Sequence, residues 1–278
     1  MNRLNYLAMC VAVVFACASL PIGGVHAEEH FKIGGTGGGL GTMKRLATLF
    51  EQENPGLVID VLPSLGSSGG IKAVAAGAID LAISSRPPKD KENDLGLMAR
   101  PYAVTAMVIV TSHSDAADSL SRETLAKMYD GSITKWSDGT PIRIVLRPVR
   151  DTDTKIIKQT IPELVEGLDI ASKQKGVATG LTDQEAADHL EKIPGSLGFL
   201  SLSVVRSEKR QLSVIALDGV APTVENIESG TYPSRKTYYF VWKKPMKNAT
   251  QKFIDFVGSR SAKSVLNEMG HSLIQGSE

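Results

Sequence analysis

Three polar loops supply side chains and backbone groups that could bind an anion. They are residues 34–39 (GGTGGG), 64–70 (SLGSSGG) and 147–154 (RPVRDTDT), and each precedes a segment with a helical pattern. The first turn of a helix leaves backbone N–H groups without partners, and its dipole favours negative charge. Glycine lets a ligand approach this backbone closely, hydroxyls add directional donors, and Arg147 adds a cation. Together the loops predict a small oxyanion that is bound without a metal.

Each loop taken alone has a simpler structural explanation. Glycine-rich turns often meet a need for positive φ, and serines before a helix are often N-caps. Arg147 could lie on the surface or form a structural ion pair. It is the combination of the three loops that favours a binding site.

Ser68 raises a competing interpretation, because Gly66, Ser68 and Gly70 match the Gly-x-Ser-x-Gly elbow of serine hydrolases. His189 or His271 could complete a triad. However, residues 63–65 separate the motif from the preceding strand pattern, whereas an elbow turns directly off its strand. Neither histidine has a recognisable catalytic context. The sequence therefore favours a binding protein with no enzymatic activity over a secreted serine hydrolase that uses Ser68.

The spacing of residues does not match the sequence motifs of nucleotide-binding or metal-binding sites. Leu40 stands where a Gly-x-Gly-x-x-Gly motif beginning at Gly35 would need glycine, and no Gly-Lys-Ser/Thr occurs. The histidines after residue 27 have no paired spacing, and no cysteine follows that residue. We expect neither a metal nor another cofactor.

Residues 1–27 have the composition of a cleaved secretory signal peptide. A basic start at Arg3 is followed by an uncharged, mostly apolar run from Tyr6 to Ala18, and by small residues at Val25 and Ala27. Both cysteines lie in this segment, so the exported chain would have no disulfide. Its removal takes away one of 31 basic residues and none of the 30 acidic ones. A net charge of zero predicts no nucleic-acid or membrane-surface partner, and export predicts a periplasmic location.

The first half of the exported chain alternates strand-like and helix-like segments. The pattern is strand, helix, strand, helix, strand over residues 31–35, 40–53, 57–63, 69–77 and 79–85. It predicts a parallel sheet that is covered by helices. We expect Asn54-Pro55-Gly56 to end the first helix and Gly77 to cap the second.

The second half follows a different order and suggests two lobes. Thr182 and Glu185 have the spacing of a capping box, which predicts a helix up to Lys192. Extended segments near Tyr102–Val110 and Arg235–Val241 could cross between the lobes. We therefore expect residues 28–105 and 238–278 in lobe 1 and residues 106–237 in lobe 2.

Three segments resemble the periplasmic phosphate-binding proteins, the solute receptors of ABC importers. They are residues 64–92 (SLGSSGGIKAVAAGAIDLAISSRPPKDKE), 120–142 (LSRETLAKMYDGSITKWSDGTPI) and 232–245 (YPSRKTYYFVWKKP). The resemblance implies the α/β, two-lobe, type II periplasmic-binding-protein fold. Each lobe is then a mixed sheet flanked by helices, and the ligand lies in the cleft between them.

The resemblance also implies which residues bind the anion. In the first loop it implies Thr36 and the backbone N–H of Gly37, with Gly38 beside them. In the second loop it implies Ser67, flanked by Ser68 and Gly69, and from the other lobe it implies Arg147. An arginine suits the task because its planar fork donates two hydrogen bonds at once.

The sequence departs from the family pattern at two places. Ser85, followed by Arg86, stands where some members have an aspartate that accepts the proton of hydrogen phosphate. Asp151-Thr152-Asp153 stands where members usually have Ser-Gly-Thr. An inward-facing carboxylate would select against sulfate, which carries no proton at neutral pH. Phosphate is therefore the favoured ligand, and molybdate, tungstate, sulfate and phosphonates stay open.

The resemblance implies a monomeric receptor that captures inorganic phosphate or a related oxyanion and delivers it to an ABC permease in the inner membrane. A sensor-coupled receptor with no transport role is an alternative with the same fold. In both cases the protein binds its ligand and breaks no bond.

Overall fold

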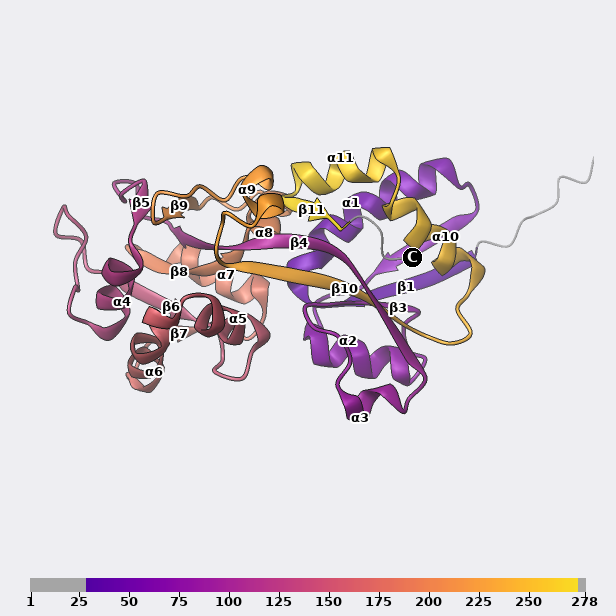
Figure 1. Ribbon diagram of the computed structural model, residues 1–278, viewed down its shortest axis with the longest axis horizontal. Coiled ribbons are helices and arrows are strands. Elements are labelled where there is room, and N and C mark those ends of the chain that lie inside the picture. Colours follow the sequence, from indigo (N-terminus) through magenta and orange to yellow (C-terminus); the bar gives the residue numbers. More distant parts are fainter. Residues whose placement is uncertain (1–28, 275–278) are drawn as a thin grey trace, which may run out of the picture.

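The computed structural model describes residues 29–274 and shows two bodies of helices and strands side by side along the long axis (Figure 1). The predicted signal peptide, residues 1–27, lies outside the described residues. In the part of the chain that is described, no helix is long and apolar enough to cross a membrane.

The first lobe begins as a β-α-β-α-β unit. Its elements are β1 (Glu29–Gly35), α1 (Gly37–Glu53), β2 (Leu57–Val61), α2 (Gly66–Ala75) and β3 (Leu81–Ser84), followed by the short α3 (Asp90–Asn93). Strand β1 pairs in parallel with β2 and β3, as the alternating pattern predicts. Because the carboxyl ends of parallel strands meet at one edge, the loops that enter α1 and α2 lie at the same edge of the sheet.

The second lobe contains the middle of the chain. Its elements are β5 (Ser119–Leu120), α4 (Arg122–Asp130), β6 (Arg143–Leu146), α5 (Thr152–Thr160), the 3-10 helix η1 (Pro162–Leu164), α6 (Val165–Lys173), β7 (Ala178–Thr179), α7 (Asp183–Lys192), β8 (Ser196–Ser201), α8 (Leu202–Ser207), β9 (Ser213–Leu217) and α9 (Val224–Ser229). Thr182 caps α7 by accepting a hydrogen bond from the backbone N–H of Glu185, which confirms the predicted helix start. The Glu185 side chain accepts from the backbone N–H of Leu181 rather than that of Thr182, so only one half of the predicted capping box forms.

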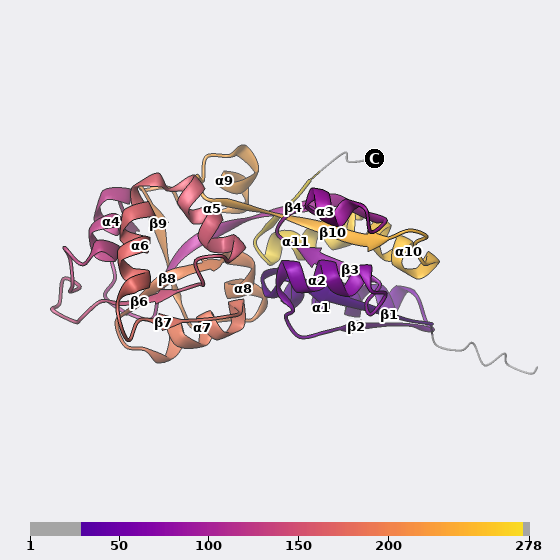
Figure 2. The same ribbon diagram turned by 90° about the horizontal axis from the view of Figure 1, so that it is seen from below.

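Two long strands connect the lobes. They are β4 (Leu97–Thr111) and β10 (Arg235–Lys243), which pair antiparallel from Leu97–Lys243 to Ala106–Arg235. The main path of the sheet runs β2-β1-β3-β10-β4-β8-β6-β7, so it passes through both lobes (Figure 2). The two predicted crossing segments lie within these strands and are confirmed. After β10 the chain returns to the first lobe as α10 (Asn248–Val257), α11 (Arg260–Glu268) and β11 (His271–Leu273).

Separate hydrophobic cores lie on either side of the crossing. The first lobe has a large cluster that includes Phe31, Phe50 and Phe253 and a smaller one around Ile71. The core of the second lobe draws its residues from Ala106 to Tyr232. The exact lobe boundaries, between residues 105 and 106 and between 237 and 238, stay a prediction.

Two helices begin earlier than the sequence predicts. Helix α1 starts at Gly37 and not at Leu40, and α2 starts at Gly66 and not at Gly69. Glycine has low helix propensity, so the pattern predicted a turn over residues 37–39, and this was wrong. The close packing of these glycines, described below, outweighs their propensity.

Candidate functional site

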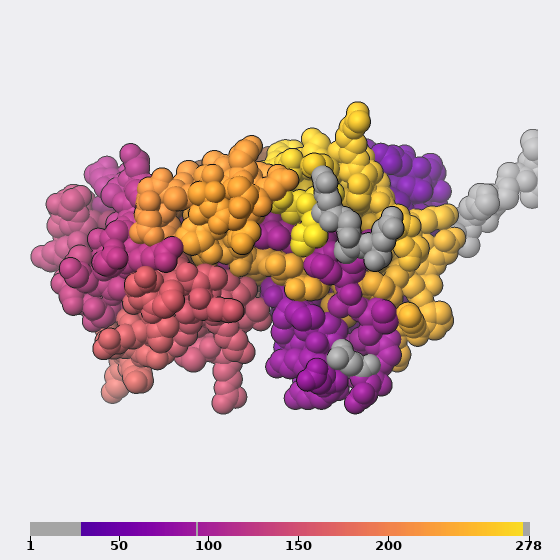
Figure 3. All heavy atoms as spheres, in the orientation of Figure 1, coloured from indigo at the N-terminus to yellow at the C-terminus, as the bar shows by residue number. Residues whose placement is uncertain are grey.

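A small polar cavity of about 190 Å³ lies between the lobes. The space-filling view shows the lobes separated by a gap along the lower edge of this face (Figure 3). A water molecule takes up about 30 Å³ of liquid, so the cavity has the volume of a few waters or of one small hydrated ion. Its lining combines hydroxyl, guanidinium and carboxylate groups from both lobes: Thr36, Ser64, Leu65, Gly66, Ser67, Ser85, Arg147, Asp151, Thr152, Asp153, Leu181, Thr182 and Asp183.

The first lobe contributes three buried hydroxyl side chains, Thr36, Ser67 and Ser85, besides the half-buried Ser64. Thr36 is the N-cap residue of α1, Ser67 lies in the first turn of α2, and Ser85 follows β3. The backbone N–H of Thr36 donates to the carbonyl of Ile83 on β3, which fixes the first loop against the third strand. All three side chains are buried. Adjacent parallel strands thus bring residues that are far apart in sequence to one wall of the cavity.

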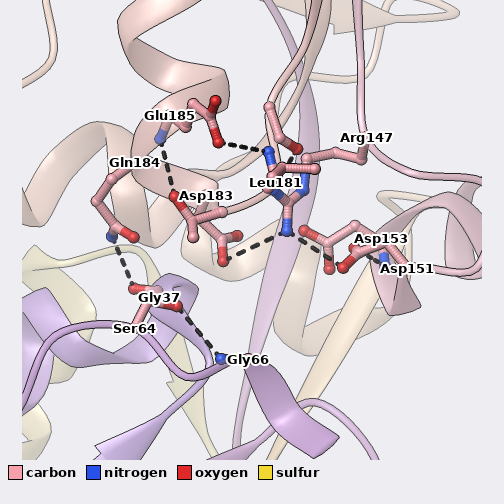
Figure 4. Close-up of polar contacts among 12 residues, drawn as sticks. Gly37, Ser64, Gly66, Arg147, Asp151, Asp153, Leu181, Asp183, Gln184 and Glu185 are labelled. Carbon is pink, nitrogen blue, oxygen red and sulfur yellow. Dashed lines mark hydrogen bonds and ion pairs between the residues drawn. The ribbon is translucent and has the colours of Figure 1, made fainter. Parts of the chain in front are cut away.

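Arg147 provides the cation on the opposite wall, where the chain leaves β6. Its Nη1 donates to the carbonyl of Gly180 at 2.7 Å, and its Nη2 lies 3.2 Å from Asp151 Oδ2 and 4.0 Å from Asp183 Oδ2 (Figure 4). Its Nε is buried and has no hydrogen-bond partner within the described residues. The guanidinium is therefore held in one orientation, and its Nε–H remains an unused hydrogen-bond donor.

The N-terminus of α5 provides the third loop, Asp151-Thr152-Asp153. Asp151 is the N-cap residue and accepts a hydrogen bond from the backbone N–H of Asp153 at 2.9 Å. Asp151 therefore has two structural partners, this N–H and Arg147. All three residues of the motif line the cavity.

Two further charged residues complete the site and were missed from the sequence. Asp183 is the first residue of α7, lines the cavity and is almost fully buried. Lys236 lies on β10, is fully buried and places Nζ 2.6 Å from Asp153 Oδ1 and 3.8 Å from Asp183 Oδ1. The capping box located Asp183 at the start of a helix, but no sequence signal placed it, or Lys236, beside the third loop.

The two buried acids differ in proton affinity. Burial raises the pKa of Asp153 to about 6; Lys236 opposes this rise, while the negative charges of Asp183 and Asp151 add to it. Burial acts in the same direction on Asp183, but Lys236 and Arg147, together with hydrogen bonds from Asp153 and from the backbone N–H of Gly38, hold its pKa below the ordinary value. Asp153 is therefore the acid that takes up a proton first.

Gly37 and Gly38 begin α1 but do not line the cavity. A Cβ on Gly37 would meet the Gln184 side chain and lie 2.9 Å from Asp183 Oδ2. A Cβ on Gly38 would meet the Tyr238 hydroxyl and lie 3.1 Å from Lys236 Nζ. These glycines let the N-terminus of α1 approach the second lobe and the crossing strand. Their predicted contact with a ligand stays a prediction.

Ser68, Gly69 and Arg86 also lie outside the cavity lining. The Arg86 guanidinium forms a salt bridge with Glu92, with Nη1 2.7 Å from Oε2, and it donates to the exposed Ser68 hydroxyl at 3.0 Å. The Arg86 side chain therefore points toward α3. Of the twelve residues predicted for the site, the structure brings together Thr36, Ser67, Ser85, Arg147, Asp151, Thr152 and Asp153.

The hydrolase interpretation gains no support from this geometry. Ser68 lies inside the first turn of α2 and not at a turn between strand and helix. The two candidate histidines have other partners: His271 Nε2 is 2.9 Å from Thr42 Oγ1, and His189 Nε2 is 3.9 Å from Glu185 Oε1. Among the described residues, no group of three or more His, Cys, Asp and Glu side chains could hold a metal ion.

With this geometry in view, comparison with known proteins identifies the family. The sequence model of the PBP superfamily domain matches residues 24–261. The chain belongs to the PBP superfamily. The phosphate-binding protein PstS of Bacillus subtilis (strain 168) is 25% identical over 234 residues, which cover 81% of this chain and 74% of that protein.

Solved structures of other superfamily members share the fold. A chain from Clostridium perfringens described as a phosphate ABC transporter substrate-binding protein, with bound phosphate, has a TM-score of 0.75 at 21% identity and covers 89% of this chain and 100% of its own. The periplasmic molybdate-binding protein of Azotobacter vinelandii has a TM-score of 0.62 at 15% identity, with 88% and 100% covered. These likenesses confirm the predicted two-lobe α/β fold.

Proposed function

We propose that this protein binds phosphate in the cavity between its lobes and serves as the substrate-binding protein of an ABC importer. The observation that carries the proposal is that hydroxyls of the first lobe (Thr36, Ser67 and Ser85) and Arg147 of the second lobe border one cavity. Donors from both lobes can replace the hydration shell of an anion only when the lobes come together. Binding and closure are therefore one event, and a permease can recognise the closed shape.

The names of related proteins support phosphate as the ligand. The Bacillus subtilis relative is named a phosphate-binding protein, and the Clostridium perfringens structure holds bound phosphate. The molybdate-binding protein with the same fold shows that the architecture also serves a different oxyanion. The choice among ligands therefore depends on the charged groups of this cavity.

Those charges favour an oxyanion that carries a proton. Asp151, Asp153 and Asp183 line the cavity, whereas Arg147 and Lys236 are the cations beside them. With every group ionised, the acids outnumber the bases by one, so an anion without a proton would be repelled. The O–H group of hydrogen phosphate can donate a hydrogen bond to a carboxylate, but sulfate has no such donor at neutral pH. We therefore infer that phosphate is preferred over sulfate.

Export through the predicted signal peptide would place the receptor in the periplasm. We infer that it acts there as a monomer that delivers its ligand to a membrane permease, and that it catalyses no reaction.

A thermal-shift and calorimetric screen of the mature protein tests the proposal. Phosphate, sulfate, molybdate, tungstate and a phosphonate are added separately at neutral pH. A ligand at a hundred times its dissociation constant stabilises the folded state by about 2.7 kcal/mol, which such a screen detects readily. We expect a clear shift with phosphate and little or none with sulfate. Equal shifts with sulfate, or none with phosphate, would contradict the proposed ligand.

A further inference from the structure

A fully buried lysine on a crossing strand faces the acids behind the cavity. Lys236 Nζ lies 2.6 Å from Asp153 Oδ1 and 3.8 Å from Asp183 Oδ1, and it donates to the Ser201 hydroxyl at 3.0 Å. Lys236 is not among the residues that line the cavity. It therefore makes no direct contact with a ligand in the cavity, and its nearest charged neighbours are the two acids.

Both acids stand between a cation and the cavity. Asp153 lies in the first turn of α5 and Asp183 begins α7, and each is at least nine-tenths buried. A buried carboxylate without a compensating cation either takes up a proton or repels a nearby anion. Lys236 supplies the compensation for both, and it does so from strand β10, outside the second-lobe helices that carry the acids.

The placement of Arg147 makes this compensation important. Asp183 Oδ2 is 4.0 Å from Arg147 Nη2, while Asp183 Oδ1 faces Lys236. Without Lys236, the charge of Asp183 would be left to Arg147, the guanidinium that lines the cavity. That guanidinium, which already lies 3.2 Å from Asp151 Oδ2, would then face a second uncompensated acid, and its attraction for an external anion would fall further.

We propose that Lys236 is a positioning residue for the anion site, which pairs with Asp153 and screens the charge of Asp183 from behind so that Arg147 stays available to the ligand. This inference rests on the proposed function. It adds a residue from the crossing strand to a site that is otherwise built from loops at the ends of the two lobes.

The inference predicts a specific change in pH dependence. With Lys236 present, Asp153 has a pKa of about 6 and is ionised at pH 8. Loss of the lysine removes the charge that opposes protonation of Asp153, so this pKa rises further. Protonation would then relieve the uncompensated charge as the pH falls. Phosphate affinity in the Lys236→Met variant should therefore be weak at pH 8 and recover toward pH 6.

Other titratable groups around Lys236 do not change charge in this range. Burial, with Lys236 and Arg206 adding to it, lowers the pKa of His271 on β11 to about 3, so this ring stays neutral. Burial raises the pKa of Tyr238 on β10, so its hydroxyl stays protonated. The charged groups near the lysine that remain are Asp153 of α5, Asp183 of α7 and, beyond them, Asp151 and Arg147.

Calorimetry with inorganic phosphate at several pH values between 6 and 8 tests the inference. The proteins are the wild type, Lys236→Met, Lys236→Arg and the double variant Lys236→Met/Asp153→Asn. At pH 8 we expect the methionine variant to bind roughly tenfold more weakly or worse, as for loss of one partner of a buried charge pair. Arginine should restore part of this loss. The double variant should restore part of it, because one of the two uncompensated carboxylates is gone.

The outcomes separate this inference from the proposed function. If the wild type binds phosphate and Lys236→Met has the same affinity at every pH, the inference is overturned. It is also overturned if the double variant binds no better than the methionine variant, since a purely structural role would give that result. Failure of the wild type to bind any oxyanion would overturn the proposed function and this inference together.

A second variant covers the case in which Lys236→Met does not fold. Lys236→Gln keeps a hydrogen-bonding side chain at this buried position but removes the charge. The inference predicts weak phosphate affinity at pH 8 and recovery toward pH 6, as in the methionine variant. A glutamine variant with wild-type affinity at pH 8 would overturn the inference.

Discussion

Ser67 Oγ lies 2.8 Å from Ser85 Oγ and accepts a hydrogen bond from the Ser85 backbone N–H at 3.0 Å. This contact joins the start of α2 to the end of β3. Because the Ser67 oxygen accepts from the backbone, its own proton remains free to be donated either to Ser85 or to a ligand. The pair therefore presents hydroxyl donors at a fixed separation on the first-lobe wall.

Substitution of Ser67 should weaken phosphate binding far more than substitution of its neighbour. We expect Ser67→Ala to lose roughly tenfold or more in affinity, which corresponds to one hydrogen bond to a charged group. Ser68→Ala is the matched control, since Ser68 is exposed and outside the cavity lining. Its affinity should change by less than about threefold. Calorimetry measures both, and equal losses in the two variants would remove Ser67 from the site.

Arg147→Ala should abolish most of the anion affinity while the protein stays folded. Removal of one partner of a desolvated charge pair costs about 2–5 kcal/mol, so we expect a loss of roughly thirtyfold or more. Arg150 is an exposed arginine in the same loop, so Arg150→Ala controls for net charge. Calorimetry gives the affinities, and circular dichroism checks the fold. Unchanged binding in the Arg147 variant would refute the assigned site.

Gly38→Ala should destabilise the protein although alanine has the higher helix propensity. The new Cβ would meet the Tyr238 hydroxyl and lie 3.0 Å from Ser201 Oγ, in a packed region where overpacking costs about 1–3 kcal/mol. Gly69→Ala is the control, because its Cβ would make one tight contact, 3.1 Å to the Cβ of the exposed Leu65, and none shorter than 3.0 Å. Urea denaturation compares the two. A Gly38 variant as stable as the wild type would show that this close approach is unimportant.

The free energy of unfolding should fall as the pH falls, because the buried His271 ring resists protonation in the folded state. Burial lowers the pKa of this ring to about 3, with Lys236 and Arg206 adding to the effect, whereas an unfolded histidine titrates near 6.5. The unfolded state therefore binds the extra proton first. The stability tied to neutral His271 is fully present above pH 6.5 and is lost as the pH falls toward 3.

The free energy of unfolding, measured by urea denaturation from pH 4 to 8, checks this prediction. His271→Gln should reduce the slope of stability against pH by up to about 1.4 kcal/mol per pH unit below pH 6.5. His30 is a half-exposed histidine of the first lobe, so His30→Gln serves as the matched control substitution. A wild-type slope that survives in the His271 variant would contradict the prediction.

The sequence was sufficient for the fold and for most of the cavity wall. Alternating strand and helix patterns predicted the parallel unit of the first lobe, and the apolar segments around Val108 and Phe240 predicted the crossing strands. Polar loops placed before helices predicted an anion site, and the resemblance to the phosphate-binding proteins assigned Thr36, Ser67 and Arg147 to it. The structure brings these three together.

The rest depends on contacts that no local pattern encodes. Lys236 occurs in an otherwise ordinary strand segment, and only the position of β10 beside α5 and α7 makes it a buried partner of Asp153. The start of α1 was misplaced because glycine disfavours helices, whereas tertiary packing against Tyr238 requires a residue without a Cβ. Arg86 could have faced either the cavity or α3, and its pairing with Glu92 turned it toward the helix.

The connection between the lobes has a mechanical consequence. Strands β4 and β10 form one hydrogen-bonded ribbon, interrupted by a register shift between Tyr238 and Tyr239. A ribbon of this kind offers no single bond about which one body could swing freely. Any change in the angle between the halves must therefore be taken up by torsion and bending of these two paired strands.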